Sequence, residues 1–420
     1  MRHISLAVVA LLVGGSTNIH GEPLAISGYY KNFFVVYDAP RIGSVNGNVD
    51  TPAAGIVTNR LRLDLRLRGS DNISAHLAYD LVPRVRPRSS LLTLSGSGLF
   101  EVPAYRAFDL KRRLYPDQES DVQNIDVIQN LDRVLVTLRT GVADLTFGRQ
   151  PIAWGSARAV NPTDVLAPFS FDELDVEDRR GVDAVRARVP LGTMSELDVG
   201  YVFGDDWAFD QSAFFVSGKA YVARTDLTLM LVGFRENLMV GLDLARAAGD
   251  AGLWVEGAYV LTDVFDTDAR EDAADYLRVT VGMDYALSGT IYGYAEYHFS
   301  EAGAGDPGRY FERLRTPGFT DGAVYLLGRH YFIPGATWAV TPLITWSAQV
   351  IVNVEDPSTL LAPQVEYNIA ENVYLSAGAF IGLGRGPVEV ADPAKIVDIT
   401  LRSEFGSYTD FFFTSFRAYF

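Results

Sequence analysis

Hydrophobic and polar residues alternate with a period of two along many short segments of the chain. In residues 59–69, NRLRLDLRLRG, four leucines occupy one face and five charged residues the other. This period indicates a β-strand because successive side chains of a strand point to opposite faces, whereas a helix would spread these leucines around its circumference. Runs over 73–80, 197–203 and 277–285 repeat the pattern. We therefore expect an all-β protein.

The lengths of these runs and of the connections between them point to a membrane barrel. Each run covers about 9 to 11 residues, which a tilted strand needs to cross the hydrocarbon core, and no apolar stretch of about 18 residues follows the N-terminal segment. Tight turns alternate with long connections, as in barrels with short periplasmic turns and long extracellular loops. The long loops are expected at 82–130, 155–180 and 300–321.

The predicted architecture is a transmembrane antiparallel up-and-down β-barrel of about 18 strands, with 16 as the alternative. The first strand is expected at 24–37, the last at 410–420, and one of the strands between them at 324–340. Residues 22–420 then form one closed sheet whose backbone groups are paired internally, with no separate soluble domain.

Both ends of the chain carry signals of export and assembly. Arg2 and His3, an apolar segment over 6–13 and a polar exit up to Gly21 have the layout of a secretory signal peptide, so residues 1–21 are expected to be removed. The last strand, FFFTSFRAYF, ends on Phe420. A terminal aromatic residue on an amphipathic strand resembles the assembly signal of outer-membrane barrels.

Composition narrows the chemistry. The chain is 48% hydrophobic with a net charge of −16, which argues against disorder and against binding to nucleic acid. It has no cysteine and five histidines, so thiolate metal sites and cysteine nucleophiles are excluded. We expect neither a metal nor a cofactor.

Residues 145–188 carry the most specific local motif. They read LTFGRQPIAWGSARAVNPTDVLAPFSFDELDVEDRRGVDAVRAR. A strand ending in Gly-Arg-Gln, a Trp-Gly break, an Asn-Pro turn, an acidic loop and a strand beginning Arg-Gly-Val-Asp-Ala resemble the module of alginate-export-type porins and related porin-like proteins. The resemblance covers about 45 residues and implies an outer-membrane channel without naming a solute.

We expect the acidic part of this module to fold inward and narrow the barrel, because irregular backbone is tolerated at membrane depth where it lines water. Two arginines are candidates to fasten the loop through carboxylates or carbonyls. The alternative is a loop that lies outside the barrel. The residues assigned to this constriction are Arg149, Gln150, Trp154, Asn161, Asp164, Asp172, Asp175 and Arg180.

Charges on the inward phase differ between the two halves of the barrel. The predicted basic lining is Arg60, Arg62, Arg66, Arg68, Arg133, Arg139, Arg186 and Arg188. The predicted acidic lining is Glu196, Asp198, Asp243, Glu256, Asp284 and Glu296. Opposed walls of this kind would set up a transverse field that favours polar solutes, and arginines suit carboxylates. The alternative is that these arginines pair with acidic residues only to hold the barrel together.

The sequence favours a passive channel for small polar solutes, preferably anions, over two other functions. A phospholipase-type enzyme could use His76, His298 or His330, yet no G-x-S-x-G motif is present. A receptor or assembly platform could use residues 82–130, of which 110–115 are helix candidates. The expected partners are the outer membrane of a Gram-negative bacterium with its lipopolysaccharide, small solutes and, as one option, two further copies in a homotrimer.

Overall fold

The structure is a computed structural model of the 420-residue chain. It describes residues 23–40, 42–43, 53–87, 105–117, 124–266, 274–321, 324–390 and 398–420. The expected signal peptide, residues 1–21, lies outside these residues.

One sheet of 19 strands contains the wall of a barrel, formed by 18 strands, and one short strand, β4. The wall strands are β1 (Leu24–Asp38), β2 (Ala54–Ser70), β3 (Ile73–Val85), β5 (Ile125–Arg139), β6 (Asp144–Pro151), β7 (Gly181–Pro190), β8 (Glu196–Val202), β9 (Ala213–Val222), β10 (Thr225–Phe234), β11 (Asn237–Ala248), β12 (Ala251–Leu261), β13 (Tyr276–Ala286), β14 (Ile291–Ser300), β15 (His330–Thr341), β16 (Ile344–Asn353), β17 (Ser358–Ala370), β18 (Val373–Leu383) and β21 (Asp410–Tyr419).

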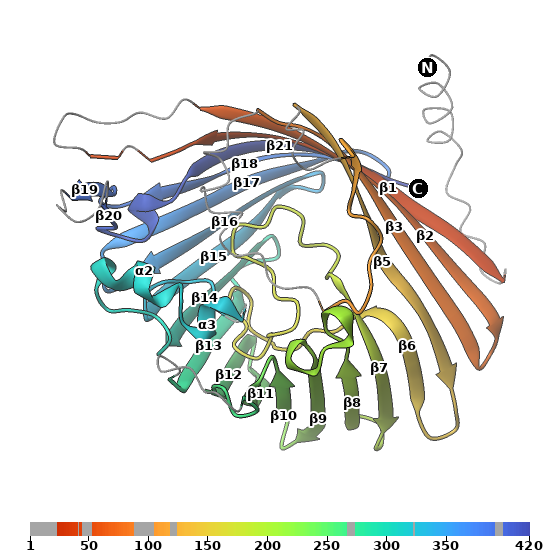
Figure 1. Ribbon diagram of the computed structural model, residues 1–420. Helices are drawn as coiled ribbons and strands as arrows, with labels where there is room; N and C mark the ends of the chain where they lie inside the picture. The colour runs from red at the N-terminus through yellow and green to blue at the C-terminus, as the bar shows by residue number, and fades with distance from the viewer. Residues whose placement is uncertain are drawn as a thin grey trace, which may run out of the picture.

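The wall is antiparallel and closed (Figure 1). Neighbouring wall strands follow chain order, and closure is made by β1, which pairs with β2 on one side and β21 on the other. Tyr29 of β1 lies opposite Arg62 and Tyr419 in these two ladders. One end of the barrel, here named the turn end, carries connections of two to five residues, and the other, the loop end, carries the long connections. The prediction of an all-β barrel with 18 strands is confirmed.

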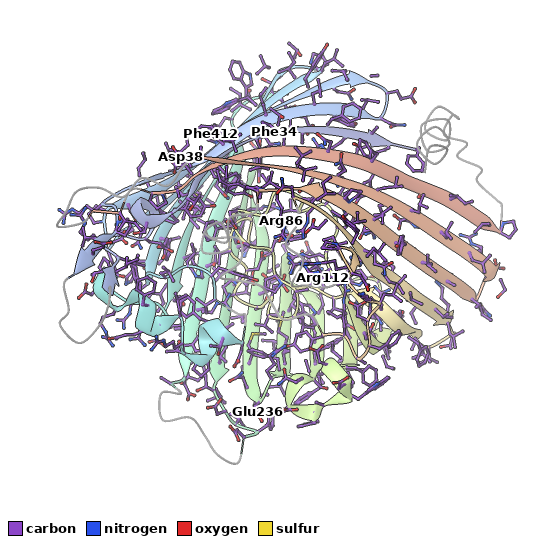
Figure 2. All side chains as sticks on the ribbon, turned by 45° about the horizontal axis from the view of Figure 1, so that its top comes forward. Phe34, Asp38, Arg86, Arg112, Glu236 and Phe412 are labelled. Carbon is purple, nitrogen blue, oxygen red and sulfur yellow. The ribbon has the colours of Figure 1, made fainter. Side chains whose placement is uncertain are left out.

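Side-chain burial follows the period of two that the sequence shows. In β2, Leu63 and Leu67 are 41% and 48% exposed, whereas Arg62, which directly precedes Leu63, is 1% exposed. The leucines therefore face outward and the arginine inward. Phe34 and Phe412 follow the same outward phase on β1 and β21 (Figure 2). No helix among the described residues is long and apolar enough to cross a membrane.

The loop end holds the short elements. These are β4 (Arg113–Tyr115), α2 (Tyr310–Arg313), α3 (Pro317–Thr320), the small pair β19 (Val388–Val390) and β20 (Asp398–Thr400), and four 3-10 turns at 205–207, 209–211, 307–309 and 405–407. The largest buried apolar cluster lies where residues 152–180 pack on the wall: Val165 and Leu166 of this loop contact a cluster that includes Phe215 and Val232.

Two local predictions are wrong. The strand expected over 324–340 begins only at His330, because Val324 and Leu326 are buried against the loops rather than placed in the wall, and the backbone N–H of Leu327 donates to Glu404. The helix considered over 110–115 is not formed: residues 113–115 are β4, which pairs with β5 at Val127 and Ile128.

Candidate channel and its crossing loop

Residues 152–180, named the crossing loop, connect β6 to β7 and run through the inside of the barrel (Figure 1). The loop first reaches the wall of β11 to β14 and then passes β21, β1 and β2 on its way to β7. Hydrogen bonds fix it at both places. The expectation that this loop folds inward agrees with its path.

Glutamates of the wall hold the first half of the loop. The Glu256 carboxylate accepts three hydrogen bonds: from the backbone N–H of Thr163 at 2.9 Å, from the Thr163 hydroxyl at 2.7 Å and from the backbone N–H of Ala157 at 3.1 Å. Glu296 accepts the backbone N–H groups of Arg158 and Ala159. Hydrogen bonds to a charged acceptor are stronger than neutral ones, so each carboxylate fastens irregular backbone that the loop itself leaves unpaired.

A glycine allows this close approach. Gly155 has φ +104°, and a Cβ atom there would lie 2.6 Å from both carboxylate oxygens of Glu256. Only glycine combines this backbone conformation with no side chain. The Trp-Gly break in the sequence therefore marks the point where the loop turns against the wall.

The predicted acidic lining is consequently occupied by the protein itself. Glu256 and Glu296 are 0% and 1% exposed, and Asp243 accepts the hydroxyl of Ser156. Asp198 pairs with Arg186 at 2.6 Å, and Asp284 pairs with Arg158 at 2.9 Å. Glu196, which lies opposite Lys219 in the β8–β9 ladder, is half-buried at the turn end.

The second half of the loop is held by basic and phenolic groups. Asp175 accepts from the Lys31 ammonium at 2.7 Å and from Arg60 at 2.8 Å. Asp178 accepts the Tyr29 hydroxyl at 2.7 Å, and Asp172 accepts the Tyr408 hydroxyl at 2.9 Å. The acids of the loop and the basic wall neutralise each other here.

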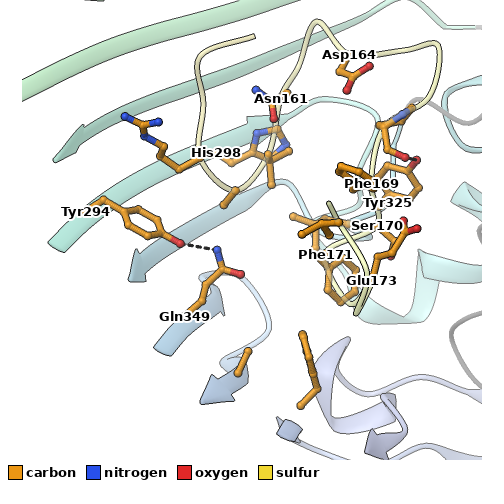
Figure 3. A pocket seen from close by; sticks show the side chains of 18 of the residues that line it. Asn161, Asp164, Phe169, Ser170, Phe171, Glu173, Tyr294, His298, Tyr325 and Gln349 are labelled. Atoms are coloured by element: carbon orange, nitrogen blue, oxygen red, sulfur yellow. Dashed lines mark hydrogen bonds between the residues drawn. The ribbon is translucent and has the colours of Figure 1, made fainter. Parts of the chain in front are cut away.

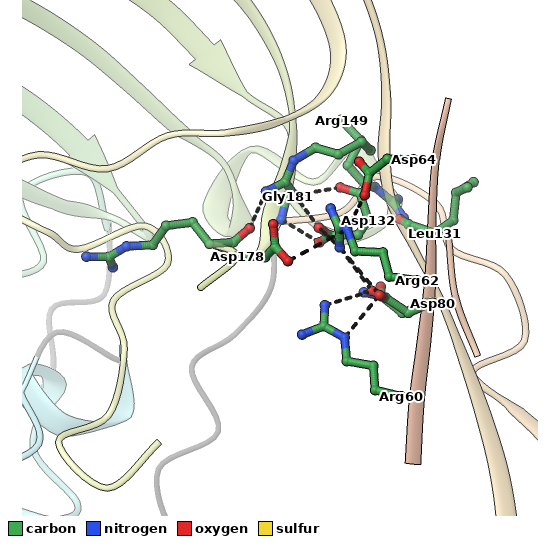
Figure 4. Close-up of polar contacts among 12 residues, drawn as sticks. Arg60, Arg62, Asp64, Asp80, Leu131, Asp132, Arg149, Asp178 and Gly181 are labelled. Atoms are coloured by element: carbon green, nitrogen blue, oxygen red, sulfur yellow. Dashed lines mark hydrogen bonds and ion pairs between the residues drawn. The ribbon is translucent and has the colours of Figure 1, made fainter. Parts of the chain in front are cut away.

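Arg62 is the centre of a buried ionic network on this wall (Figure 4). Its guanidinium lies 2.9 Å from Asp64, 2.9 Å from Asp132 and 3.3 Å from Asp80. Asp80 also forms an ion pair with Arg60 at 3.0 Å. A buried ionic group needs such partners because it has lost its hydration.

Sequence reasoning missed two members of this region, Asp132 and Lys31. The β3–β5 ladder has an irregularity at Ala78 and Tyr79, opposite Asp132, and this extra residue places both Asp132 and Arg133 on the inside. A strand without a bulge places successive residues on opposite faces. With Arg133 inside the barrel, the sequence pattern therefore places Asp132 outside. Lys31 and Tyr29 both lie on the inward phase of β1. The alternation of hydrophobic and polar residues could have placed Lys31 inside the barrel.

The eight predicted basic residues fall into two groups. The buried or half-buried ones with acidic partners are Arg60, Arg62, Arg133 and Arg186. Arg66, Arg68 and Arg139 are exposed and Arg188 is half-buried, all toward the turn end. Acids of the same wall and of the crossing loop neutralise the first group, which is the alternative that the sequence left open for these arginines.

Arg149 fastens a different loop from the one expected. It pairs with Asp183 at 2.8 Å and donates to the Leu131 carbonyl at 2.7 Å, to Asp109 at 3.0 Å and to the Phe108 carbonyl. It therefore ties residues 105–109 to β5, β6 and β7 and leaves the crossing loop untouched. The short strand β6 pairs with β5 only from Val134 onward. Nearer the loop end, β4, which belongs to residues 105–117, pairs with β5 instead.

The other residues assigned to the constriction lie in or beside the crossing loop. Gln150 donates to the Ala184 carbonyl at 3.1 Å, and Trp154 packs edge-on against Phe215 at 5.0 Å. The Asn161 side-chain amide donates to Glu256 at 3.2 Å. Asp164 pairs with Arg179. Arg180 is largely exposed and lies 3.6 Å from Glu173, so it pins the loop only weakly.

Among the described residues, two cavities lie inside the barrel beside the crossing loop. The first, about 470 Å³, lies between the loop and strands β14 to β18 and is lined by both charged and neutral polar groups (Figure 3). Gln349 donates to the Tyr294 hydroxyl at 2.6 Å on its wall. The second, about 680 Å³, lies toward the turn end and is lined by residues that include Arg224, Arg246 and Asp226. The lumen is thus narrowed and not filled.

A second buried polar cluster ties the loops together at the loop end. Glu404 accepts from the Leu327 N–H at 2.8 Å, from the Asn353 amide at 2.8 Å and from the Tyr331 hydroxyl. Asp356 accepts the Tyr310 hydroxyl at 2.8 Å and the Glu404 N–H. Burial raises the pKa of Glu404 to about 7, against the lowering effect of these hydrogen bonds.

Each of the three candidate histidines contacts a side chain of the barrel wall. His76 contacts Asp64 at 2.7 Å, His298 contacts the Thr280 hydroxyl at 2.9 Å, and His330 contacts the Tyr297 hydroxyl at 2.6 Å. Within the described ranges, no three residues of the types His, Cys, Asp and Glu are grouped in a way that could hold a metal ion.

Comparison with solved structures identifies the fold. The crystal structure of OprD from Pseudomonas aeruginosa matches with a TM-score of 0.54 and 9% identity over 95% of this chain and 94% of that one. Acinetobacter baumannii OccAB3 matches with a TM-score of 0.54 and 9% identity over 94% and 99% of the chains. Pseudomonas aeruginosa OccK2 (OpdF), in complex with glucuronate, matches with a TM-score of 0.53 and 12% identity over 94% and 97%.

These likenesses show a porin-like barrel. No family model matches the chain, and no curated protein matches it either. The solved structures named above include no alginate-export porin.

Proposed function

We propose that this chain is a passive outer-membrane channel of a Gram-negative bacterium that admits small polar solutes and prefers anions. The observation that carries the proposal is a loop that crosses the inside of an 18-strand barrel and leaves two cavities beside it, each with polar and charged lining residues. Such a loop sets the width of the path, and the groups that line the path set its selectivity. An enzyme or a receptor would not need a path of this kind.

The preference for anions rests on which lumen charges stay exposed. Asp175 of the crossing loop is paired with Lys31 and Arg60, and the wall acids Glu256 and Glu296 are covered by the loop. Arg66, Arg68 and Arg139 are exposed at the turn end, on the inward phase of β2 and β5. A solute entering the lumen there meets positive charge, which concentrates anions. OccK2, the solved structure with glucuronate, offers a parallel for an anionic solute.

The proposed location follows from the outward face of the barrel. Leu63 and Leu67 belong to a surface of exposed apolar side chains that suits contact with lipid tails. We propose the lipid bilayer and lipopolysaccharide as its surroundings, with the loop end outside the cell. Assembly of a homotrimer, the relation to alginate-export-type porins and the role of Phe420 as an assembly signal stay predictions. Phe420 does pair with Gly28 of β1, which donates to its carbonyl at 2.8 Å.

Reversal potentials in a salt gradient test the selectivity. The double variant Arg66→Glu and Arg68→Glu should lower the permeability ratio of chloride to potassium, because it turns positive charge at the turn end negative. Arg309→Glu is the matched control, because Arg309 is exposed on a 3-10 turn at the loop end. Equal ratios in the double variant and in the wild type would contradict the preference for anions.

A further inference from the structure

The two cavities of the lumen share one lining residue. Arg158 lines both the cavity of about 470 Å³ and the cavity of about 680 Å³, and no other described residue lines both. Arg158 therefore borders both spaces. A solute that moves from one cavity to the other comes past this shared residue.

The backbone of Arg158 is fixed. Its N–H donates to Glu296, and the next N–H, of Ala159, donates to the same carboxylate at 2.9 Å. Because Glu296 belongs to β14 and is buried, the Cα position of Arg158 is tied to the wall. Movement at this point of the loop is thus left to the side chain.

The side chain is held by weak contacts. It is 52% exposed, its Nη2 donates to Asp284 at 2.9 Å, and its guanidinium carbon lies 5.3 Å from the centre of the Trp254 ring. Because the guanidinium itself is half-exposed, its ion pair and its contact with the ring contribute less free energy than they would if the arginine were buried. The guanidinium can therefore leave Asp284 at low cost.

Asp284 is the fixed partner of the pair. Its carboxylate also accepts the Tyr292 hydroxyl at 2.8 Å and the backbone N–H of Gly252 at 3.0 Å, and its side chain is 15% exposed. These two hydrogen bonds do not involve Arg158, so they hold the Asp284 carboxylate in place when the arginine moves away. The arginine can then pair with the same carboxylate again.

We propose that Arg158 is the gate between the two cavities, and that a small anion passes by taking the place of the Asp284 carboxylate at the guanidinium. The side chain then swings with the anion from one cavity to the other and pairs again with Asp284. A neutral solute has no group that replaces the carboxylate, so it crosses only when the pair opens spontaneously. This proposal rests on the channel function proposed above.

Two variants should shift the selectivity in opposite directions in planar-bilayer recordings in potassium chloride. Arg158→Ala removes the cation and should raise the conductance while lowering the ratio of chloride to potassium permeability. Asp284→Asn frees the arginine and should raise both quantities. Each change should be about two- to fivefold, the range that an exposed ion pair corresponds to. Arg158→Lys keeps a point charge and should retain most of the anion preference.

Arg246→Ala is the matched control, because Arg246 is exposed and lines only the cavity at the turn end. The proposal is overturned if Arg158→Ala and Asp284→Asn behave like Arg246→Ala, or if both shift the permeability ratio in the same direction. Absence of current from the folded wild-type protein would contradict the channel function itself, so the two failures are distinguishable. Migration of the unheated protein in a gel shows that each variant has folded.

Discussion

The carboxylate of Glu256 on β12 accepts the backbone N–H of Thr163 at 2.9 Å and so joins the wall of the barrel to the middle of the crossing loop. The same carboxylate also accepts the Thr163 hydroxyl, the Ala157 N–H and the Asn161 amide. One buried side chain thus holds a segment of seven residues, 157–163, across the lumen. We regard this contact as the main determinant of the width of the path.

Replacing Glu256 by alanine should release the loop. The variant loses several hydrogen bonds to a charged group, each worth about 1.5 to 3 kcal/mol. The loop should then leave the wall part of the time, and single-channel recordings should show a larger and noisier conductance. Asp226→Ala, an exposed acid that lines the cavity at the turn end, is the control and should leave the noise unchanged. If the Glu256→Ala variant gives a conductance and a noise level equal to those of the wild type, the anchoring role is refuted.

Replacing Arg62 by alanine should destabilise the barrel. The change leaves the buried carboxylates of Asp80 and Asp132 without their shared cation, and breaking a buried ion pair costs about 3 to 5 kcal/mol. Unfolding in guanidinium chloride, followed by tryptophan fluorescence, should show the loss. Arg66→Ala, which removes an exposed arginine of the same strand, should change the free energy of unfolding by less than about 0.5 kcal/mol. Equal effects of the two variants would mean that the network contributes nothing to stability.

The fold was largely predictable because a barrel wall repeats one simple rule. In β2, outward leucines and inward charges alternate, so strand, face and length could all be inferred from residues 59–69. The last strand was predicted in the same way. The start of β15 was not. Leu326 packs in a cluster with Phe405, and Val324 and Leu327 pack in the cluster of Val165 and Leu166, so both contacts join segments far apart in the chain.

The candidate site was predicted only in part. The Asn-Pro turn and the acidic composition indicated an irregular loop between β6 and β7, and the inward phase identified Glu256, Glu296 and Arg60. Which of these charges meet each other depends on the path of the loop through the lumen, which no local pattern specifies. Arg149 shows this limit, because its position at the end of β6 suggested the crossing loop, while its contacts join residues 105–109 to β5 and β7.

Replacing Arg149 by alanine should free residues 105–117 from the wall. Arg149 is 2% exposed and joins Asp183, Asp109 and two backbone carbonyls, so the segment loses its main attachment to β5 and β7. Limited trypsin digestion of the folded protein should cut at Lys111 or Arg112 several times faster than in the wild type. Arg139→Ala, at the turn end, serves as the control. Unchanged cleavage in Arg149→Ala would contradict this assignment.

Stability should depend on pH through Glu404. Burial raises the pKa of Glu404 to about 7 in the folded protein, above the value near 4.5 of an ordinary glutamate. Between these two values the folded state binds more protons than the unfolded state, so the free energy of unfolding falls as the pH rises from 4.5 to 7. The contribution of Glu404 is thus complete below pH 4.5 and is lost as the pH passes 7.

Glu404→Gln removes this titration and should flatten the dependence in the same pH window. Guanidinium unfolding at a series of pH values provides the measurement. Glu312→Gln, an exposed acid on α2, should keep the slope of the wild type. A slope that persists in Glu404→Gln would assign the effect to other groups.

Ion current through purified, folded protein in a planar lipid bilayer tests the central claim most directly. An open path beside the crossing loop predicts stepwise insertions, each adding a steady current that Glu256→Ala enlarges. A folded protein that inserts into the bilayer and carries no current would contradict a channel through this barrel.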